Sequence, residues 1–160
     1  MSRSAMAALI VCGAIFLVSC APSAINPGDK IGDFLITTGD AESVSYGWGV
    51  SCVQEGTTEN YRCDAKVGRK VNVSENIYGS GATDLETMWT QHTHEIFING
   101  RPVNLEAFGW LEAVHPHVGA MRQWNVAILA SAPGEIPVRN TGVVDGDPFD
   151  SRVTFSFSGP

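Results

Sequence analysis

All four histidines of the chain fall in two pairs that each enclose one residue, His92/His94 and His115/His117. Residues i and i+2 of a β-strand point to the same side of the sheet, so such a pair could present two imidazoles together. Imidazole nitrogens are good ligands for Zn²⁺ and Cu²⁺. If the loop of the second pair folds over the face of the first, four imidazoles would converge on one ion. The alternative is that these histidines are surface or half-buried side chains that bind nothing specific.

Three aspartates in one expected turn, Asp145, Asp147 and Asp150, could bind Ca²⁺ through their carboxylate oxygens. The segment is not an EF-hand loop, because its glycine is misplaced and no glutamate stands at the twelfth position. Hairpin turns favour aspartate and glycine without any ion. A calcium site and a solvated turn therefore stay open as alternatives, and we expect no cofactor apart from these Zn/Cu or Ca candidates.

Recognisable catalytic motifs are missing from the sequence, which has no G-x-S-x-G, P-loop, H-E-x-x-H or C-x-x-C. We therefore expect a non-catalytic binding protein rather than an enzyme. A metal-binding protein that uses the histidine pairs is the alternative, and a hydrolase with a scattered site is a third. Trp110 lies in the least regular segment, where an exposed aromatic would stack on a sugar or on a protein partner.

The first 20 residues carry one basic residue, Arg3, and then an uncharged apolar stretch over about residues 5–18. That stretch is shorter than the ~20 apolar residues that a spanning helix needs. It closes on Leu17-Val18-Ser19-Cys20 and resembles the signal peptide and lipobox of bacterial lipoproteins. The resemblance implies cleavage before Cys20 and a lipid on its thiol. An uncleaved anchor or an ordinary secretory signal would be the alternative.

The residue after the lipobox, Ala21, implies sorting to the outer membrane in a Gram-negative cell. In a monoderm the protein would sit on the outer face of the plasma membrane. Cys12 would leave with the signal, which leaves Cys52 and Cys63 in an oxidising compartment. We predict a disulfide between them, worth roughly 2.5–3 kcal/mol in the chain-entropy model, rather than two free buried thiols.

The formal net charge is −7, and removal of the signal peptide with its Arg3 would make it one unit more negative. An acidic surface disfavours nucleic acid and anionic head groups as partners. We expect contact with the membrane through the lipid, and a partner that is an envelope protein or a glycan.

The domain organisation expected is a signal peptide over residues 1–19, a lipidated tether over 20–29 and a β-sandwich domain over 30–160. Apolar stretches in the domain are short, rich in β-branched and aromatic residues and bounded by Gly and Pro, which favours an all-β fold. Asn99-Gly100 is a strong hairpin signal. Residues 105–113 could hold a helical turn. The expected strands are residues 33–38, 43–53, 61–63, 70–74, 87–98, 101–105, 123–129, 135–144 and 151–158.

The last third of the chain resembles the end of an immunoglobulin-like or fibronectin-type domain. A strand with Trp124, a Pro-Gly turn, a strand that passes Arg139 and a final Thr- and Phe-rich strand follow one another in that order. The resemblance implies an antiparallel sandwich of seven or eight strands. Two features depart from it: no tyrosine corner is evident, and the Cys52/Cys63 pair is too close in sequence to be the inter-sheet disulfide of antibody domains.

Overall fold

The computed structural model describes residues 22–40, 42–45, 50–56, 59–115 and 119–159. Cys20 and His117 lie outside these residues, as does the lipobox. Fourteen strands and two helices occur within them. They are β1 (Lys30–Ile31), β2 (Phe34–Thr37), β3 (Val44–Ser45), β4 (Ser51–Gln54), β5 (Asn60–Lys66), β6 (Lys70–Asn72), β7 (Asn76–Gly79), α1 (Ala82–Gln91), β8 (Thr93–Ile98), β9 (Arg101–Pro102), α2 (Leu105–Phe108), β10 (Trp110–His115), β11 (Gly119–Trp124), β12 (Ala127–Ala130), β13 (Gly134–Val144) and β14 (Asp147–Ser158).

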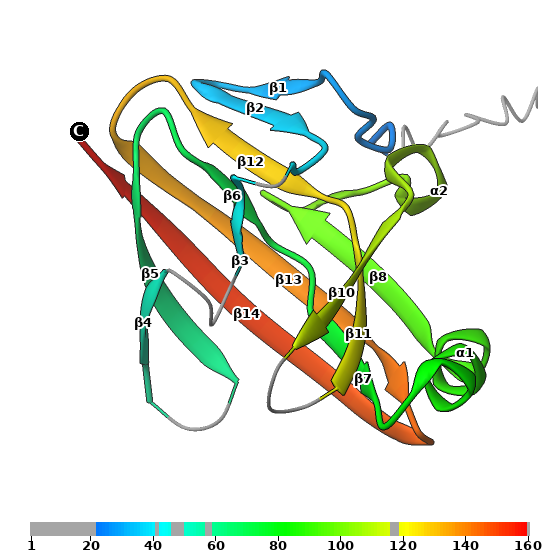
Figure 1. Ribbon diagram of the computed structural model, residues 1–160. Helices are drawn as coiled ribbons and strands as arrows, with labels where there is room; N and C mark the ends of the chain where they lie inside the picture. Colours follow the sequence, from blue (N-terminus) through cyan, green and yellow to red (C-terminus); the bar gives the residue numbers. More distant parts are fainter. Residues whose placement is uncertain (1–21, 41, 46–49, 57–58, 116–118, 160) are drawn as a thin grey trace, which may run out of the picture.

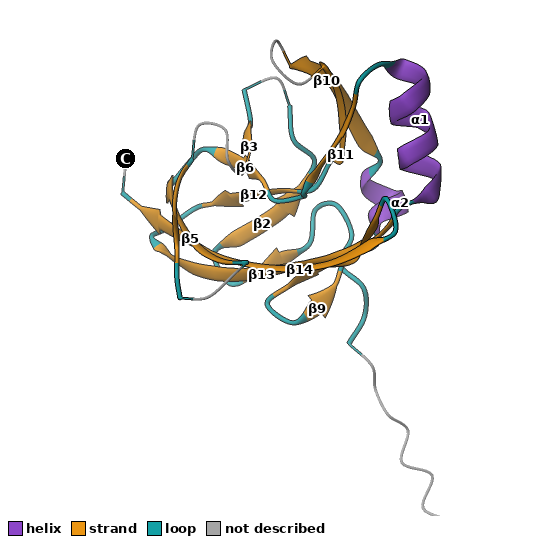
Figure 2. Cartoon of the chain, turned by 90° about the horizontal axis from the view of Figure 1, so that it is seen from below, coloured by secondary structure: helices purple, strands orange, loops and turns teal. Residues whose placement is uncertain are grey.

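The strands form three sheets in two layers. A six-stranded sheet has the order β4-β5-β14-β13-β8-β9, and it curves beneath a five-stranded sheet of order β1-β2-β12-β6-β3 and a three-stranded sheet of order β10-β11-β7. Figure 2 shows both smaller sheets and α1 on the concave side of the large one. The long strands β13 and β14 run diagonally across the whole molecule in Figure 1.

The β13–β14 hairpin forms because its residues alternate between apolar and polar in the half that lies away from the turn. Ile136 and Val138 are buried on β13, and Val153, Phe155 and Phe157 are buried on β14, so both strands turn one apolar face toward the smaller sheets. The strands meet at Asp145-Gly146, where both residues have positive φ, at 53° and 84°. Two central residues with positive φ are what a tight type I′ hairpin turn requires.

The inner face of this hairpin changes character along its length. The inner face is apolar near the C-terminal end of β14 and polar near the hairpin turn. Near the turn, Asn140 of β13 and Ser151 of β14 are paired across the hairpin, and both are buried. His94 of β8 lies opposite Gly142, two residues nearer to the turn. The sheet therefore supplies a core at one end and a group of polar side chains at the other.

Helix α1 corrects the expectation of one strand over residues 87–98. The segment Ala82–Gln91 is helical, and the strand begins only at Thr93. Alanine, leucine, glutamate and methionine favour helix here. The helix begins beside Gly79, where a Cβ would lie 2.5 Å from the backbone nitrogen of Leu85, and Leu85 is the buried residue of the helix.

The all-β class is confirmed, but the arrangement is not purely antiparallel. Strand β14 pairs parallel with β5, and β3 pairs parallel with β6. The expectation of seven or eight strands was too low, and the immunoglobulin-like connectivity is not confirmed by this strand order. The short helix α2 occupies the segment where a helical turn was expected.

The disulfide between Cys52 and Cys63 is formed as predicted. The two residues face each other in the antiparallel β4–β5 pair, at the edge of the six-stranded sheet. Ile25, which the sequence places in the tether, is fully buried in the core and forms a parallel bridge with Val103. The packed domain therefore begins before residue 30, the boundary expected from the sequence.

Candidate functional site

A pocket of about 380 Å³ lies at the polar end of the large sheet, near the turn of the β13–β14 hairpin. It draws residues from β5, β7, β8, β13 and β14. Its polar and aromatic lining consists of Glu59, Tyr61, Glu75, Asn76, His94, Asp147, Phe149 and Ser151. A concave site of this size that mixes apolar walls with a few polar groups is typical of small-molecule sites in proteins.

Glu75 reaches the pocket because the chain crosses between two sheets there. Strand β6 ends at Asn72 in the five-stranded sheet, and β7 begins at Asn76 in the three-stranded sheet. Hydrogen bonds fix the crossing: the Asn72 side chain accepts from the backbone N–H of Ser74 at 3.1 Å, and the Ser74 hydroxyl accepts from the N–H of Trp124 at 3.2 Å. Asn72 and Ser74 are both buried, so this polar stretch is part of the interior.

The carboxyl of Glu75 is held by a single short hydrogen bond. The hydroxyl of Ser151 donates to Glu75 Oε1 at 2.6 Å. Burial raises the pKa of Glu75 above its ordinary value, and the nearby carboxylate of Glu59 raises it further, against the lowering effect of Ser151. Glu75 therefore sits in the pocket as a carboxyl group whose negative charge is poorly compensated.

Two linked hydrogen bonds fix the orientation of the His94 imidazole, and burial keeps it neutral. The Asn140 amide donates to the carbonyl oxygen of Val73 at 3.0 Å, which leaves Asn140 Oδ1 to accept from His94 Nε2 at 3.0 Å. Burial lowers the pKa of His94 to about 4, outweighing the opposite effect of Asn140. The ring of Phe149 packs edge-on against His94, with the centroids 5.4 Å apart.

The pocket contains a serine and a histidine, but the described side chains do not form the Ser-His hydrogen bond of a catalytic triad. Ser151 donates to Glu75, whereas His94 Nε2 bonds to Asn140, so neither hydrogen bond joins serine to histidine. A triad would need that link.

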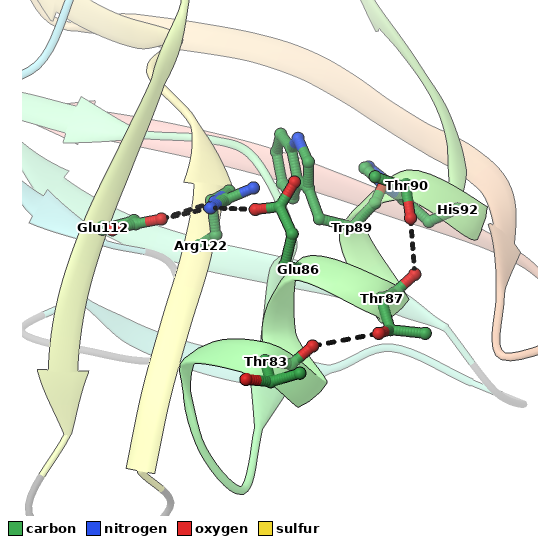
Figure 3. Close-up of polar contacts among 8 residues, drawn as sticks. All are labelled: Thr83, Glu86, Thr87, Trp89, Thr90, His92, Glu112 and Arg122. Atoms are coloured by element: carbon green, nitrogen blue, oxygen red, sulfur yellow. Dashed lines mark hydrogen bonds and ion pairs between the residues drawn. The ribbon is translucent and has the colours of Figure 1, made fainter.

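A second polar cluster lies between α1 and the β10–β11 pair (Figure 3). Arg122, whose side chain is only 8% exposed, bonds to Glu86 of α1 at 2.8 Å and to Glu112 of β10. Its guanidinium stacks on Trp89 and on Trp110, at 5.1 and 4.3 Å from the ring centroids. Trp110 is 47% exposed, as expected, but it has one face on Arg122. These contacts hold α1 against the three-stranded sheet.

The structure brings His92 and His94 together, although not as two residues of one strand. His92 is the C-cap of α1, and its ring lies 6.2 Å from that of His94. His92 Nδ1 donates to the carbonyl of Trp89 at 2.5 Å, and its Nε2 is buried with no hydrogen-bond partner. The side chain of His115 and the whole of His117 lie outside the described residues, so the convergence of four imidazoles stays a prediction.

The three aspartates do not gather around a common point. Asp145 is at the hairpin turn, Asp147 starts β14, and Asp150 forms two hydrogen bonds of 2.7 Å with Arg139. Arg139 also lowers the pKa of Asp150. Within the described residues, no group of three or more His, Cys, Asp or Glu side chains is arranged to hold a metal ion. The calcium site at these three aspartates therefore stays a prediction, with the solvated turn as its alternative.

Sequence reasoning missed most of the pocket, namely Tyr61, Glu75, Phe149 and Ser151. The one usable signal was the polar stretch at residues 72–76, which directly follows the buried Val71 and precedes the buried Ile77. Polar residues between two apolar strand positions indicate a segment that needs internal partners.

Comparison with known proteins adds no relative: no family model, no curated protein and no solved structure matches this chain. In the part of the chain that the structure describes, none of the helices has the length and apolar character to cross a membrane.

Proposed function

We propose that this chain is an exported, lipid-anchored binding protein that holds a small ligand in the pocket near the β13–β14 turn, without chemical conversion. The observation that carries the proposal is the pocket itself, a 380 Å³ concavity that is lined by residues of five strands and receives polar groups from four of them. The hydrogen bonds of Glu75 and His94 already fix these groups in place, so a ligand would meet a preformed site. The lipobox at Cys20 supports the location.

Metabolic labelling with palmitate tests the anchor. The full chain expressed in a bacterial host should take up label, and Cys20→Ser should lose it, while Cys12→Ser keeps it because Cys12 would leave with the signal. An unlabelled wild type with a mature N-terminus elsewhere would overturn this part of the proposal.

A thermal-shift screen of small molecules tests the pocket. Compounds that raise the melting temperature of the wild type should fail with Val144→Trp, which places a large ring at a lining position. They should still act on Val53→Trp, since Val53 is 66% exposed and does not line the pocket. Hits that act equally on both variants would place the site elsewhere.

A second candidate function, metal binding, is favoured by the paired imidazoles. In His92 and His94 one nitrogen of each ring donates to an oxygen acceptor, the carbonyl of Trp89 and the amide of Asn140. Metal-ligating histidines usually donate their other N–H in this way, which leaves a lone pair for the ion. Burial lowers the pKa of both imidazoles, so both stay neutral near pH 7.

Calorimetric titration with ZnCl₂ and CuCl₂ tests this candidate. Micromolar or tighter binding should disappear in His92→Ala/His94→Ala, and it should weaken as the pH falls toward the lowered pKa of His94, about 4, where the imidazole takes up a proton. If His115→Ala/His117→Ala also abolishes binding, all four histidines contribute. No heat from either ion would rule the metal function out.

A further inference from the structure

We infer that the pocket near the β13–β14 turn selects small organic ammonium ions that carry an apolar body, in preference to neutral or anionic molecules of the same shape. This inference rests on the proposed binding function and names the chemical class of its ligand. It is argued from the charges, the unsatisfied polar atoms and the apolar walls of the pocket.

The pocket collects acceptors of hydrogen bonds. The carboxyl of Glu75 receives one described hydrogen bond, from Ser151, and keeps further acceptor capacity. Asn76 Oδ1 is a second acceptor at the same wall, and it is buried with no hydrogen-bond partner. A buried acceptor without a donor costs free energy, and a ligand with several N–H donors would remove that cost. An ammonium group carries three donors and no acceptor.

The charge around the pocket has one sign. Glu59, Glu75 and Asp147 line it, whereas neither lysine nor arginine occurs among the described lining residues. Arg139 and Arg152 both pair with Asp150, all three side chains are exposed, and none of them lines the pocket. His94 adds no positive charge near pH 7, because burial lowers its pKa to about 4. Among the described lining residues, no positively charged side chain would therefore compete with a bound cation for the carboxylates.

The apolar walls would hold the body of such a ligand. Phe149, Ile77 and Val144 line the same cavity as the carboxylates. Aromatic faces attract cations and also pack against hydrocarbon, so an amine attached to a ring or a short chain meets both requirements. A small hydrated inorganic ion would leave these walls uncovered.

Ammonium binding would also explain the unusual state of Glu75. Its pKa is raised by burial and by Glu59, while Ser151 lowers it. The other titratable groups that line the cavity are Tyr61, His94 and Asp147. A bound ammonium favours the ionised carboxylate, so binding should release protons from Glu75 at a pH near its raised pKa.

Three molecules of one shape provide the test: benzylamine, benzyl alcohol and benzoate, titrated calorimetrically into the full chain purified from whichever cell fraction holds it. We expect benzylamine to bind about tenfold more tightly than benzyl alcohol, or better, which is the scale of a charge-assisted hydrogen bond, and benzoate to bind least. Titrations in buffers of different ionisation enthalpy should show proton release with benzylamine.

Variants separate the pocket from the general charge of the protein. Glu75→Gln keeps an acceptor for Ser151, and it should lose the preference for benzylamine together with the proton release. Asp147→Asn, at an exposed position, should reduce the preference only several-fold. Glu95→Gln is the matched control, because Glu95 follows His94 on β8, is exposed and does not line the pocket. It should behave as the wild type. Thermal melting shows whether each variant is folded.

Two outcomes would overturn the inference: benzyl alcohol or benzoate binding as tightly as benzylamine, or no binding by any of the three. An ammonium preference that persists in folded Glu75→Gln would also overturn it. Failure here is distinguishable from failure of the proposed function, because a neutral or anionic compound from the thermal-shift screen that is lost in Val144→Trp would leave the binding function intact.

Discussion

Glu75 and His94 are ionisable side chains of opposite type that one environment pushes toward the same uncharged state. Burial raises the pKa of the acid and lowers the pKa of the base, and in both cases it is the largest cause. Each keeps one fixed partner, Ser151 or Asn140, that holds its geometry. Because the pKa values of both groups are shifted, a charged ligand in the pocket would change their protonation.

His94 should make folding stability depend on pH between about 4 and 6.5. The unfolded chain binds a proton at His94 below its ordinary pKa of 6.5, whereas the folded chain does so only near 4. The contribution is therefore complete above 6.5 and is lost as the pH falls through this window, by at most about 3 kcal/mol.

Urea unfolding of the wild type and of His94→Gln from pH 4 to 7 measures this effect. The difference in unfolding free energy between the two proteins should change across the window. The raised pKa of Glu75 acts with the opposite sign above its ordinary value of 4.5 and is present in both proteins, so it cancels in the difference. Parallel curves would show that His94 titrates normally.

At the scale of elements, the sequence predicts strands where alternation is clean, and it fails where tertiary contacts decide. The β13–β14 hairpin and the β8–β9 hairpin at Asn99-Gly100 follow from period-2 patterning and turn chemistry. Helix α1 carries Ala82, Leu85 and Trp89 at helical spacing, but it has only ten residues and buries only Leu85, so its apolar stripe is too short to stand out in the sequence. The position of α1 depends on Arg122 of β11, which pairs with Glu86 of the helix and with Glu112 of β10.

The candidate site was predictable only in part for the same reason. His94 stood out as one of a conspicuous pair, but Glu75 and Ser151 meet through a contact between distant segments. Nothing in the local sequence of Ser151 marks it as a partner of Glu75. The crossing of the chain between two sheets at residues 73–75 sets that contact, and strand order does not follow from periodicity.

Gly79 should be required for the packing of α1 on β7. A methyl group at this position would lie 2.5 Å from the backbone nitrogen of Leu85, so Gly79→Ala must push the helix away from the strand. We expect a loss of about 1–3 kcal/mol in unfolding free energy, the usual cost of overpacking. Gly81→Ala is the control, because it has open space and an extended backbone. Equal stability of the two variants in urea would contradict the model of a tight contact.

Considering the whole molecule, the disulfide cross-links β4 to β5 at the edge of the six-stranded sheet, and β5 also contributes a residue to the pocket. Strand β5 carries Cys63 and Tyr61, and it joins β4 to β14. Its parallel pairing with β14 connects segments far apart in the chain. The cross-link therefore stabilises a non-local part of the fold.

Removing the disulfide should lower the unfolding free energy by about 2–3 kcal/mol. Cys52→Ser/Cys63→Ser and reduced wild type should unfold at the same urea concentration, below that of the oxidised protein. Peptide mapping without reductant should recover the two cysteines as one linked peptide. An unchanged midpoint after reduction would show that the bond adds no stability.

If the chain is anchored by a lipid on Cys20, as proposed, the burial of Ile25 would set how far the domain can stand from the membrane. Ile25 is pinned between Pro102 and Asn104 by backbone hydrogen bonds of 2.8 and 2.9 Å. With the lipid on Cys20, four residues lie between the anchor and Ile25. The five residue-to-residue steps of an extended chain span at most about 18 Å. The chain enters the domain beside α2, away from the β13–β14 turn (Figure 1). The short tether of an anchored molecule would thus restrict its rotation. Its pocket would sample the layer of solvent next to the bilayer surface rather than the open compartment.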